Sequence, residues 1–223
     1  RLAREGTLFS SAYSPSPLCL PARSALMSGR RVHELQAYNN CTLGLLRDFP
    51  SWGALLAAQG VFTIYIGKVD VYKPGSELGF SEMILAGERM APGDLNFCRQ
   101  PLKVRENAHQ RAGGFGALDA DDPGDVAIMS AACEFITGRA RDLQRPWILA
   151  VNINNPHFPH NCRRELFDRY RGYAEVPVLG TEEETARHPH AVDLRRHFKT
   201  GQFTEKQRRG LRQGYYGCVD FVD

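Results

Sequence analysis

The sequence lacks any long uninterrupted apolar run, and it carries little net charge. A helix that crosses a bilayer needs about 20 consecutive apolar residues, and no stretch of the 223 residues approaches that length. The formal net charge is +3, which is too small to indicate a nucleic-acid partner. The arginine pairs Arg163-Arg164 and Arg208-Arg209 are typical of solvated helix faces. We therefore expect neither a membrane span nor a nucleic-acid partner.

The six cysteines lack the spacing of a metal or disulfide framework. They are scattered without a CxxC pair, at Cys19, Cys41, Cys98, Cys133, Cys162 and Cys218. This pattern argues against a zinc ribbon and against a disulfide-dense scaffold. No internal repeat or low-complexity segment is visible either. The chain begins without methionine and ends inside an apolar pattern, so we expect an internal segment of a longer protein.

Apolar strands alternate with helical patterns along the chain. Residues 61–68 (VFTIYIGK) and 146–157 (PWILAVNINNPH) read as buried strands. Helices are predicted from a Ser51 cap to Gln59, from Pro123 to about Gln144, and after Thr204. The segments 73–121, rich in glycine and turn residues, and 172–203, with mixed charge and histidine, show no clear element pattern, and long connections of this kind are often substrate-facing loops. This alternation predicts an α/β sandwich with a central, mostly parallel sheet flanked by helices.

Helical spacing predicts which faces of the two longest helices are buried. The apolar positions that recur every three or four residues are Val126, Met129, Cys133 and Ile136 in the first, and Leu211, Tyr215, Cys218 and Val222 in the second. For the second helix, Thr204 and Gln207 also form a capping box.

Cys19 precedes a proline by two positions and an arginine by four. Pro21 suits the first turn of a helix, because its missing N–H costs nothing there. We therefore place Cys19 just outside a helix N-terminus, where free N–H groups and the helix dipole favour an anion. Arg23 adds a positive charge within one turn.

Three interpretations of this cysteine compete. Most free cysteines are buried and structural, which is the simplest one. A cysteine-dependent phosphatase needs an arginine six positions after its nucleophile, where this chain has Ala25, and that interpretation fails. The third treats C-x-P-x-R as a recognition signal for modification of Cys19.

Four blocks of the chain resemble motifs of one family. Residues 19–30 (CLPARSALMSGR) resemble the sulfatase signature, whose cysteine is oxidised to formylglycine after translation. GKVD at 67–70 stands in place of GKxH, NNPHFP at 154–159 resembles PHxP, and YYGCVDFVD at 215–223 resembles YYAxVxxVD. The blocks occur in family order over nearly the whole chain. The sequence thus resembles the formylglycine-dependent sulfatases of the alkaline-phosphatase superfamily, and most of all the arylsulfatase K branch.

The resemblance implies a mechanism centred on Cys19. As formylglycine it would be hydrated to a diol, one hydroxyl of which, activated by Ca²⁺, attacks sulfur. The second hydroxyl would then let sulfate leave as the aldehyde reforms. In that form residue 19 would also be a metal ligand, with the other ligands outside this chain. Arg23 would hold the diol and balance charge at the metal.

The resemblance also assigns four substrate-facing residues. Lys68, at a strand end, would contact the sulfate, and His157 would contact it and protonate the leaving oxygen, since histidine titrates near neutral pH. Asp70 is the main departure, because most sulfatases have a histidine there and a carboxylate cannot donate a hydrogen bond. It would orient a base or contact substrate hydroxyls. Asn155 replaces a lysine that often precedes PHxP, which would alter contacts to sulfate or sugar.

The whole chain, residues 1–223, is therefore expected to be part of a sulfatase catalytic domain without its first strand and its C-terminal half. We expect such a segment to bind Ca²⁺ poorly and to be inactive alone. The implied substrate is a sulfated small molecule or carbohydrate, such as 2-O-sulfated glucuronate in glycosaminoglycan degradation. The implied maturation partner is a formylglycine-generating enzyme. Family analogy suggests a lysosomal, secreted or periplasmic protein, although the sequence itself specifies no compartment.

Two rival functions remain open. A phosphonate or phosphodiester hydrolase would use the same formylglycine scaffold. A non-catalytic descendant would bind sulfate or carbohydrate and would keep Cys19 as an unmodified thiol.

Overall fold

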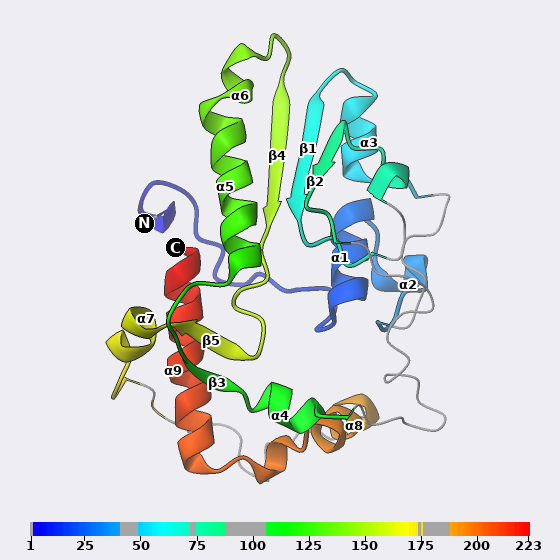
Figure 1. Cartoon of the computed structure of the whole chain (residues 1–223). Helices are drawn as coiled ribbons and strands as arrows, with labels where there is room; N and C mark the ends of the chain where they lie inside the picture. Colours follow the sequence, from blue (N-terminus) through cyan, green and yellow to red (C-terminus); the bar gives the residue numbers. More distant parts are fainter. Residues whose placement is uncertain (1, 41–48, 72–74, 88–105, 174, 176–187) are drawn as a thin grey trace. The chain divides into compact units, whose positions relative to one another are not determined.

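The computed structural model describes residues 2–40, 49–71, 75–87, 106–173, 175 and 188–223, which Figure 1 draws in colour. The chain forms two compact units. The first comprises Arg1–Ile64, Val69–Leu95 and Arg145–Ile148, and the second comprises Tyr65–Lys68, Asn96–Gln144 and Leu149–Asp223. The chain passes from one unit to the other within two of its strands.

The first unit contains mainly short helices. Its elements are η1 (Leu2–Arg4), α1 (Cys19–Ser28), α2 (Val32–Leu35), α3 (Trp52–Ala57), η2 (Gly75–Leu78) and the strand β2 (Glu82–Ile84). The predicted cap of α3 is confirmed, because the Ser51 side chain accepts a hydrogen bond from the Ala54 backbone N–H at 3.0 Å. The helix ends at Ala57, two residues before the predicted end.

The second unit contains the longest helices and a small sheet. Its elements are α4 (Ala108–Ala112), β3 (Phe115–Leu118), α5 (Pro123–Thr137), α6 (Arg139–Asp142), β5 (His160–Arg163), α7 (Arg164–Arg169), α8 (Pro189–Phe198), η5 (Thr200–Gln202) and α9 (Glu205–Val222). Strands β3 and β5 pair in parallel, with Phe115 opposite His160. The segments 73–121 and 172–203, which the sequence pattern left unassigned, include β2, α4, β3 and α8 where they are described, so they are not loops throughout.

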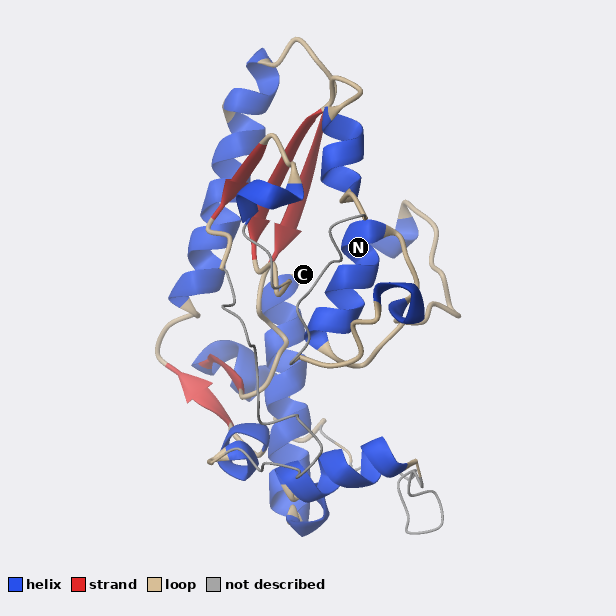
Figure 2. Cartoon of the chain, turned by 90° about the vertical axis from the view of Figure 1, so that its right-hand side faces the viewer, coloured by secondary structure: helices blue, strands red, loops and turns tan. Residues whose placement is uncertain are grey.

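The main sheet confirms the predicted α/β class. Strand β1 (Phe62–Gly67) lies between β2 and β4 (Trp147–Asn152), and the three run side by side in Figures 1 and 2. The Phe62 N–H donates to the Pro146 carbonyl and the Lys68 N–H to the Asn152 carbonyl, each at 2.8 Å. Because both bonds advance in the same direction along the two strands, β1 and β4 are parallel. All six residues of β1 are buried, whereas Val151 of β4 is 42 % exposed.

Helix α5 begins where the sequence predicted and ends earlier. Asp122 is its N-cap, accepting hydrogen bonds from the Gly124 and Asp125 N–H groups at 3.0 Å, and Pro123 is its first residue. The helix stops at Thr137, and Gly138 separates it from α6. The single helix predicted to continue to about Gln144 is therefore two helices. Gly138 has a φ of −108° and a ψ of −98°, outside the helical region, and glycine disfavours helix because it loses the most backbone freedom there.

The predicted buried face of α5 is wrong. The buried residues are Asp125, Ile128, Ala132 and Phe135, whereas Val126, Met129, Cys133 and Ile136 are exposed. The two stripes lie side by side with the same spacing, so periodicity alone does not separate them. Asp125 made the stripe to which it belongs a poor candidate for burial, because an aspartate is seldom buried without hydrogen-bond partners.

Helix α9 is held close to the small sheet by glycines. Its predicted capping box is confirmed, with Thr204 accepting from the Gln207 N–H at 3.2 Å. The buried positions are Gly210, Gly214, Gly217 and Cys218, whereas Tyr215 is 42 % exposed. A Cβ at Gly214 would collide with the His160 carbonyl of β5. The predicted apolar stripe is therefore wrong except at Cys218, because the helix packs through its smallest residues instead.

Candidate functional site

The first unit carries Cys19 at the start of α1. Cys19 is the first helical residue and Leu18 is the N-cap, so the predicted position just outside the helix is one step off. Pro21 lies in the first turn, as predicted. The Leu20 N–H, one of the free donors of this turn, is buried and donates to the Asn40 side-chain oxygen at 3.0 Å. The half-buried Cys19 thus begins a helix whose N-terminus is fixed by a side chain 20 residues away.

Two more predicted residues belong to the first unit. Arg23 is half-buried, one turn after Cys19 on α1. Asp70 is 5 % exposed and has a backbone φ of 51°, a left-handed conformation that aspartate tolerates better than most residues.

In the second unit, Lys68 follows β1 where this strand meets β4. The Lys68 N–H donates to the Asn152 carbonyl at 2.8 Å, and the Tyr65 hydroxyl donates to the Lys68 carbonyl at 2.8 Å. Gly67 has a φ of 95°, and a Cβ there would collide with the same Asn152 carbonyl. Glycine is therefore required at this position for the two strand ends to approach each other.

His157 lies on the loop that follows β4. Its N–H donates to the Asn154 carbonyl at 2.9 Å, closing a turn, and the peptide bonds before Pro156 and Pro159 are cis. The imidazole is exposed, and its Nδ1 lies 2.6 Å from the Phe158 carbonyl oxygen. Because a carbonyl only accepts hydrogen bonds, Nδ1 carries the proton in this contact. Nε2 remains the ring nitrogen with which His157 can exchange a proton.

Asp125 is the residue of this region that the sequence reasoning missed. Its carboxylate is fully buried, at 0 % exposure. Oδ1 accepts from the Asn154 N–H at 2.7 Å, and Oδ2 accepts from the Asn155 N–H and side-chain amide, each at 2.8 Å. A signal for it existed in the sequence, namely a single acid at the head of the apolar stripe that continues through Ile128 and Ala132.

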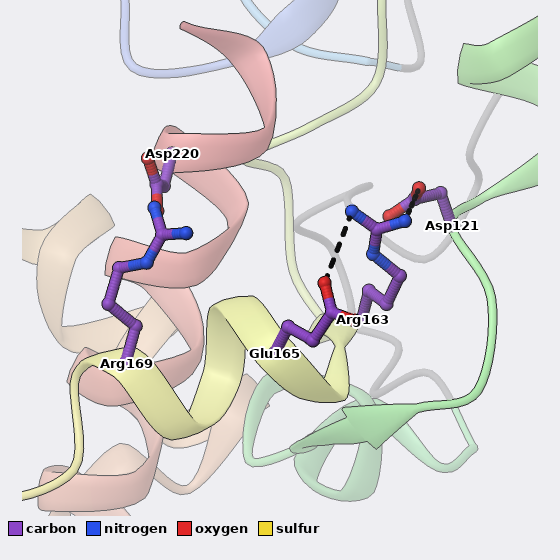
Figure 3. Close-up of polar contacts among 5 residues, drawn as sticks. All are labelled: Asp121, Arg163, Glu165, Arg169 and Asp220. Carbon is purple, nitrogen blue, oxygen red and sulfur yellow. Dashed lines mark hydrogen bonds and ion pairs between the residues drawn. The ribbon is translucent and has the colours of Figure 1, made fainter.

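Beyond His157 the loop runs into β5, which is tied back to the start of α5. The His160 N–H donates to the Gly114 carbonyl at 2.9 Å. At the end of β5, Arg163 pairs with Asp121 at 3.7 Å and with Glu165 at 3.6 Å, as Figure 3 shows. Ion pairs that are largely exposed to solvent contribute about 1 kcal/mol or less to the free energy of unfolding, so these pairs add little stability.

Figure 3 also shows the pair that links α7 to α9. The Arg169 guanidinium lies 2.5 Å from the Asp220 carboxylate. Near this pair, Cys162 of β5 and Cys218 of α9 are buried together against Leu166 of α7. The hydrogen bond with Cys218, together with burial, raises the pKa of the Cys162 thiol. Cys162 therefore stays protonated at neutral pH and is unsuited to act as a nucleophile.

The predicted site residues thus fall into two sets. The second unit carries Lys68 just after β1, and Asn155 and His157 on the loop that follows β4; the first unit carries Cys19, Arg23 and Asp70. A hollow of about 630 Å³ in the second unit, lined by residues such as Phe115, Phe167 and Arg209, includes none of these.

A calcium site is not completed by the residues that the structure describes. Among them, no group of three or more His, Cys, Asp or Glu side chains is placed to hold a metal ion. These residues alone therefore do not fit the Ca²⁺ implied by the resemblance. Within the same residues, every helix is too short or too polar to cross a bilayer.

The fold and the site together define a class of protein. It is a parallel α/β protein with polar side chains at the carboxyl ends of adjacent strands, where such folds place their ligands. A model of the sulfatase family matches residues 1–223. The chain therefore belongs to the sulfatase family.

Individual relatives agree with this assignment. The chain is 26 % identical over 239 residues to a choline-sulfatase from Rhizobium meliloti (strain 1021), covering 100 % of this chain and 46 % of that protein. It is 27 % identical over 237 residues to arylsulfatase K from Xenopus laevis, covering 100 % and 42 %. The chain thus spans less than half the length of these two curated relatives.

A solved structure shares the fold. The phosphonate monoester hydrolase of Agrobacterium radiobacter matches with a TM-score of 0.67 at 21 % identity, over 99 % of this chain and 51 % of that one. The expected alkaline-phosphatase-like α/β fold is confirmed, here as about half of the neighbour's chain.

Proposed function

We propose that the full-length protein containing this chain is a sulfuric ester hydrolase that uses a formylglycine formed from Cys19. The observation that carries the proposal is the junction of β1 and β4 in a chain of the sulfatase family. There the 2.8 Å bond between the Lys68 N–H and the Asn152 carbonyl joins a strand-end lysine to the strand that leads into the His157 loop. An ammonium group and an imidazole anchored on adjoining strand ends suit an anionic ester that must be held and protonated.

Each residue has a distinct role in this proposal. When present, a formylglycine hydrate at position 19 would supply the attacking hydroxyl and a second hydroxyl that releases sulfate. Lys68 binds the sulfate oxygens through its ammonium group. His157 donates the proton on Nε2 to the leaving oxygen, while Nδ1 stays bound to the Phe158 carbonyl. Arg23 provides positive charge next to residue 19.

Asp70 and Asn155 are proposed to contact the part of the substrate beyond the sulfate. A carboxylate repels sulfate but accepts hydrogen bonds from sugar hydroxyls, which favours a sulfated carbohydrate such as 2-O-sulfated glucuronate. Similarity to arylsulfatase K supports this choice. Similarity to a choline-sulfatase makes choline sulfate the competing substrate, because a carboxylate also attracts a quaternary ammonium. Initial rates on the two sulfates, with Asp70→Asn as the probe variant, separate them.

The test of reaction class compares matched esters. The full-length protein, co-expressed with a formylglycine-generating enzyme, is assayed on 4-nitrophenyl sulfate and on 4-nitrophenyl phenylphosphonate. We expect a kcat/KM at least about 100-fold higher on the sulfate, a difference of about 2.7 kcal/mol in transition-state binding. A higher value on the phosphonate would favour the second candidate, a phosphonate or phosphodiester hydrolase, for which the shared fold is the supporting observation.

Activity is proposed to require the longer protein. The chain spans less than half of the relatives it matches, and the family resemblance places the other metal ligands outside it, so we expect residues 1–223 alone to bind Ca²⁺ poorly and to lack useful turnover. Calorimetric titration of the segment with Ca²⁺ tests the first expectation. Full sulfatase activity of the isolated segment would contradict the second. The formylglycine-generating enzyme is the proposed maturation partner, in a lysosomal, secreted or periplasmic setting.

A further inference from the structure

Asp125 is a buried carboxylate to which the proposed chemistry gives no role. It lies in the first turn of α5 and is fully shielded from solvent. Burying an ionised carboxylate costs several kcal/mol unless hydrogen bonds replace its water shell. Three charge-assisted hydrogen bonds replace it here, all at 2.7–2.8 Å and all from Asn154 and Asn155.

The first turn of α5 orients the Asp125 carboxylate independently of the loop that carries His157. The Asp122 side chain caps α5 by accepting the Asp125 N–H, which fixes the direction in which the Asp125 side chain leaves the helix. The free N–H groups and the positive end of the helix dipole also favour a negative charge in this turn. One turn further on, Ile128 lies against Gly67, at the end of β1. The same helix thus contacts the strand end that precedes Lys68.

The hydrogen bonds of Asp125 act on the backbone that leads into His157. Two of its three donors are consecutive main-chain N–H groups, and a single residue, Pro156, separates Asn155 from His157. The His157 N–H in turn donates to the Asn154 carbonyl, so the turn that carries the imidazole rests on a residue held by Asp125. On the far side, the His160 N–H fixes the loop to Gly114. The loop is therefore fixed on both sides of His157, by Asp125 at Asn154 and Asn155 and by Gly114 at His160.

We propose that Asp125 is a positioning residue that aligns His157 with the leaving oxygen of the substrate. This inference rests on the proposed function, in which His157 protonates that oxygen. Asp125 does not touch the substrate; it fixes where the imidazole lies. Proton donation matters most when the leaving group is a poor one, such as a sugar hydroxyl, and little when it is 4-nitrophenolate. The contribution of Asp125 therefore depends on the leaving group.

The test uses the full-length protein with Asp125→Asn and a matched control, Asp122→Asn. Both variants exchange a carboxylate for an amide on the same helix. Asparagine caps a helix about as well as aspartate, so the control keeps α5 intact. In Asp125→Asn one amide N–H₂ must face a backbone N–H of Asn154 or Asn155. Steady-state kinetics are measured on a sulfated glucuronate and on 4-nitrophenyl sulfate, and hydrogen exchange is measured on the peptide that contains residues 152–160.

For Asp125→Asn we expect kcat on the sugar sulfate to fall by about 30-fold or more, a large part of the roughly 100-fold to 10,000-fold that general acid catalysis contributes. On the aryl sulfate we expect a loss below about 5-fold, because little proton donation is required there. Exchange at Asn154 and Asn155 should accelerate in this variant alone. Should Asp125→Asn fail to fold, Asp125→Glu, which keeps the charge but shifts it by one methylene, is expected to give the same pattern.

Equal losses on the two substrates would overturn the inference, because a merely structural carboxylate lowers the folded fraction for both alike. Activity equal to that of Asp122→Asn would overturn it as well. A wild-type protein inactive on both sulfates would instead refute the proposed function. In that case hydrogen exchange still decides whether Asp125 holds the loop, and unchanged exchange would refute the hold itself.

Discussion

Replacing Gly67 by alanine tests the strand junction on which the site is built. Gly67 has a φ of 95°, and an added Cβ would collide with the Asn152 carbonyl and lie 2.9 Å from the Ile128 side chain. The carbonyl is the acceptor for the Lys68 N–H. It cannot move away without breaking the bond between the ends of β1 and β4. The substitution therefore strains the backbone and separates the two strand ends at once.

The expected cost has two parts. A non-glycine residue in this backbone region costs about 1–3 kcal/mol, and overpacking at a site that cannot relax adds about 1–3 kcal/mol. Gly60 is the matched control, because it precedes the same strand, has a φ of 83° and has no atom within 4 Å of an added Cβ. Gly60→Ala therefore carries only the backbone cost. We expect Gly67→Ala to be less stable than Gly60→Ala by about 1–3 kcal/mol.

Urea denaturation of the full-length protein, followed by tryptophan fluorescence, measures the difference between the two variants. The sulfatase assay is run in parallel, and Gly67→Ala should lose turnover while Gly60→Ala retains most of it. Equal stability of the two variants would refute the reasoning, because it would mean that the strand ends do not approach as closely as the structure indicates.

Two further predictions concern α9 and the thiols. Thr204→Ala removes the acceptor for the Gln207 N–H and should lower the free energy of unfolding by about 1 kcal/mol, measured by the same denaturation experiment; an unchanged midpoint would contradict the capping box. Iodoacetamide labelling of the native protein at neutral pH should modify the exposed Cys133 and leave the buried Cys162 and Cys218 unmodified. Peptide mass spectrometry checks this, and labelling of Cys162 as fast as Cys133 would contradict its burial.

Local signals predicted the helix starts and the central strand well. Ser51 and Thr204 cap the helices expected of them, and α5 begins at Pro123 as predicted, because these signals depend on neighbouring residues alone. Most of the β-branched and aromatic run at 61–68 became the strand β1, Phe62–Gly67, all six residues of which are buried. By contrast, the sequence shows that a glycine precedes Lys68 but does not show that this glycine closely approaches the Asn152 carbonyl.

Faces and tertiary partners were not predictable in this way. Helix α9 packs through three glycines, whose contribution is the absence of a side chain and which hydrophobic periodicity does not count. Helix α5 buries Asp125 because Asn154 and Asn155, 29 and 30 residues later in the chain, donate to it. The Asn40 side chain reaches the start of α1 from 20 residues away. Each of these contacts joins residues that are far apart in the chain, and the spacing of residues in one sequence does not show which distant residues meet.

The sequence motifs predicted which residues form the candidate site, but not how those residues are arranged in space. The motifs nominated Lys68, Asn155 and His157, which lie in one unit, after β1 and on the loop after β4. Their roles remain predictions, as do those of Cys19 and Arg23. The sequence did not indicate what holds the His157 loop, because the supporting carboxylate lies outside every motif of the family resemblance.

The modification state of residue 19 tests the central claim most directly. The tryptic peptide from Glu5 to Arg23 of the mature full-length protein is analysed by mass spectrometry, and the Cys19→Ala variant is assayed beside the wild type. We expect the mass of formylglycine in place of cysteine, together with loss of turnover in the variant. An unmodified thiol in a protein that cleaves sulfate esters, or undiminished activity with alanine at position 19, would contradict it.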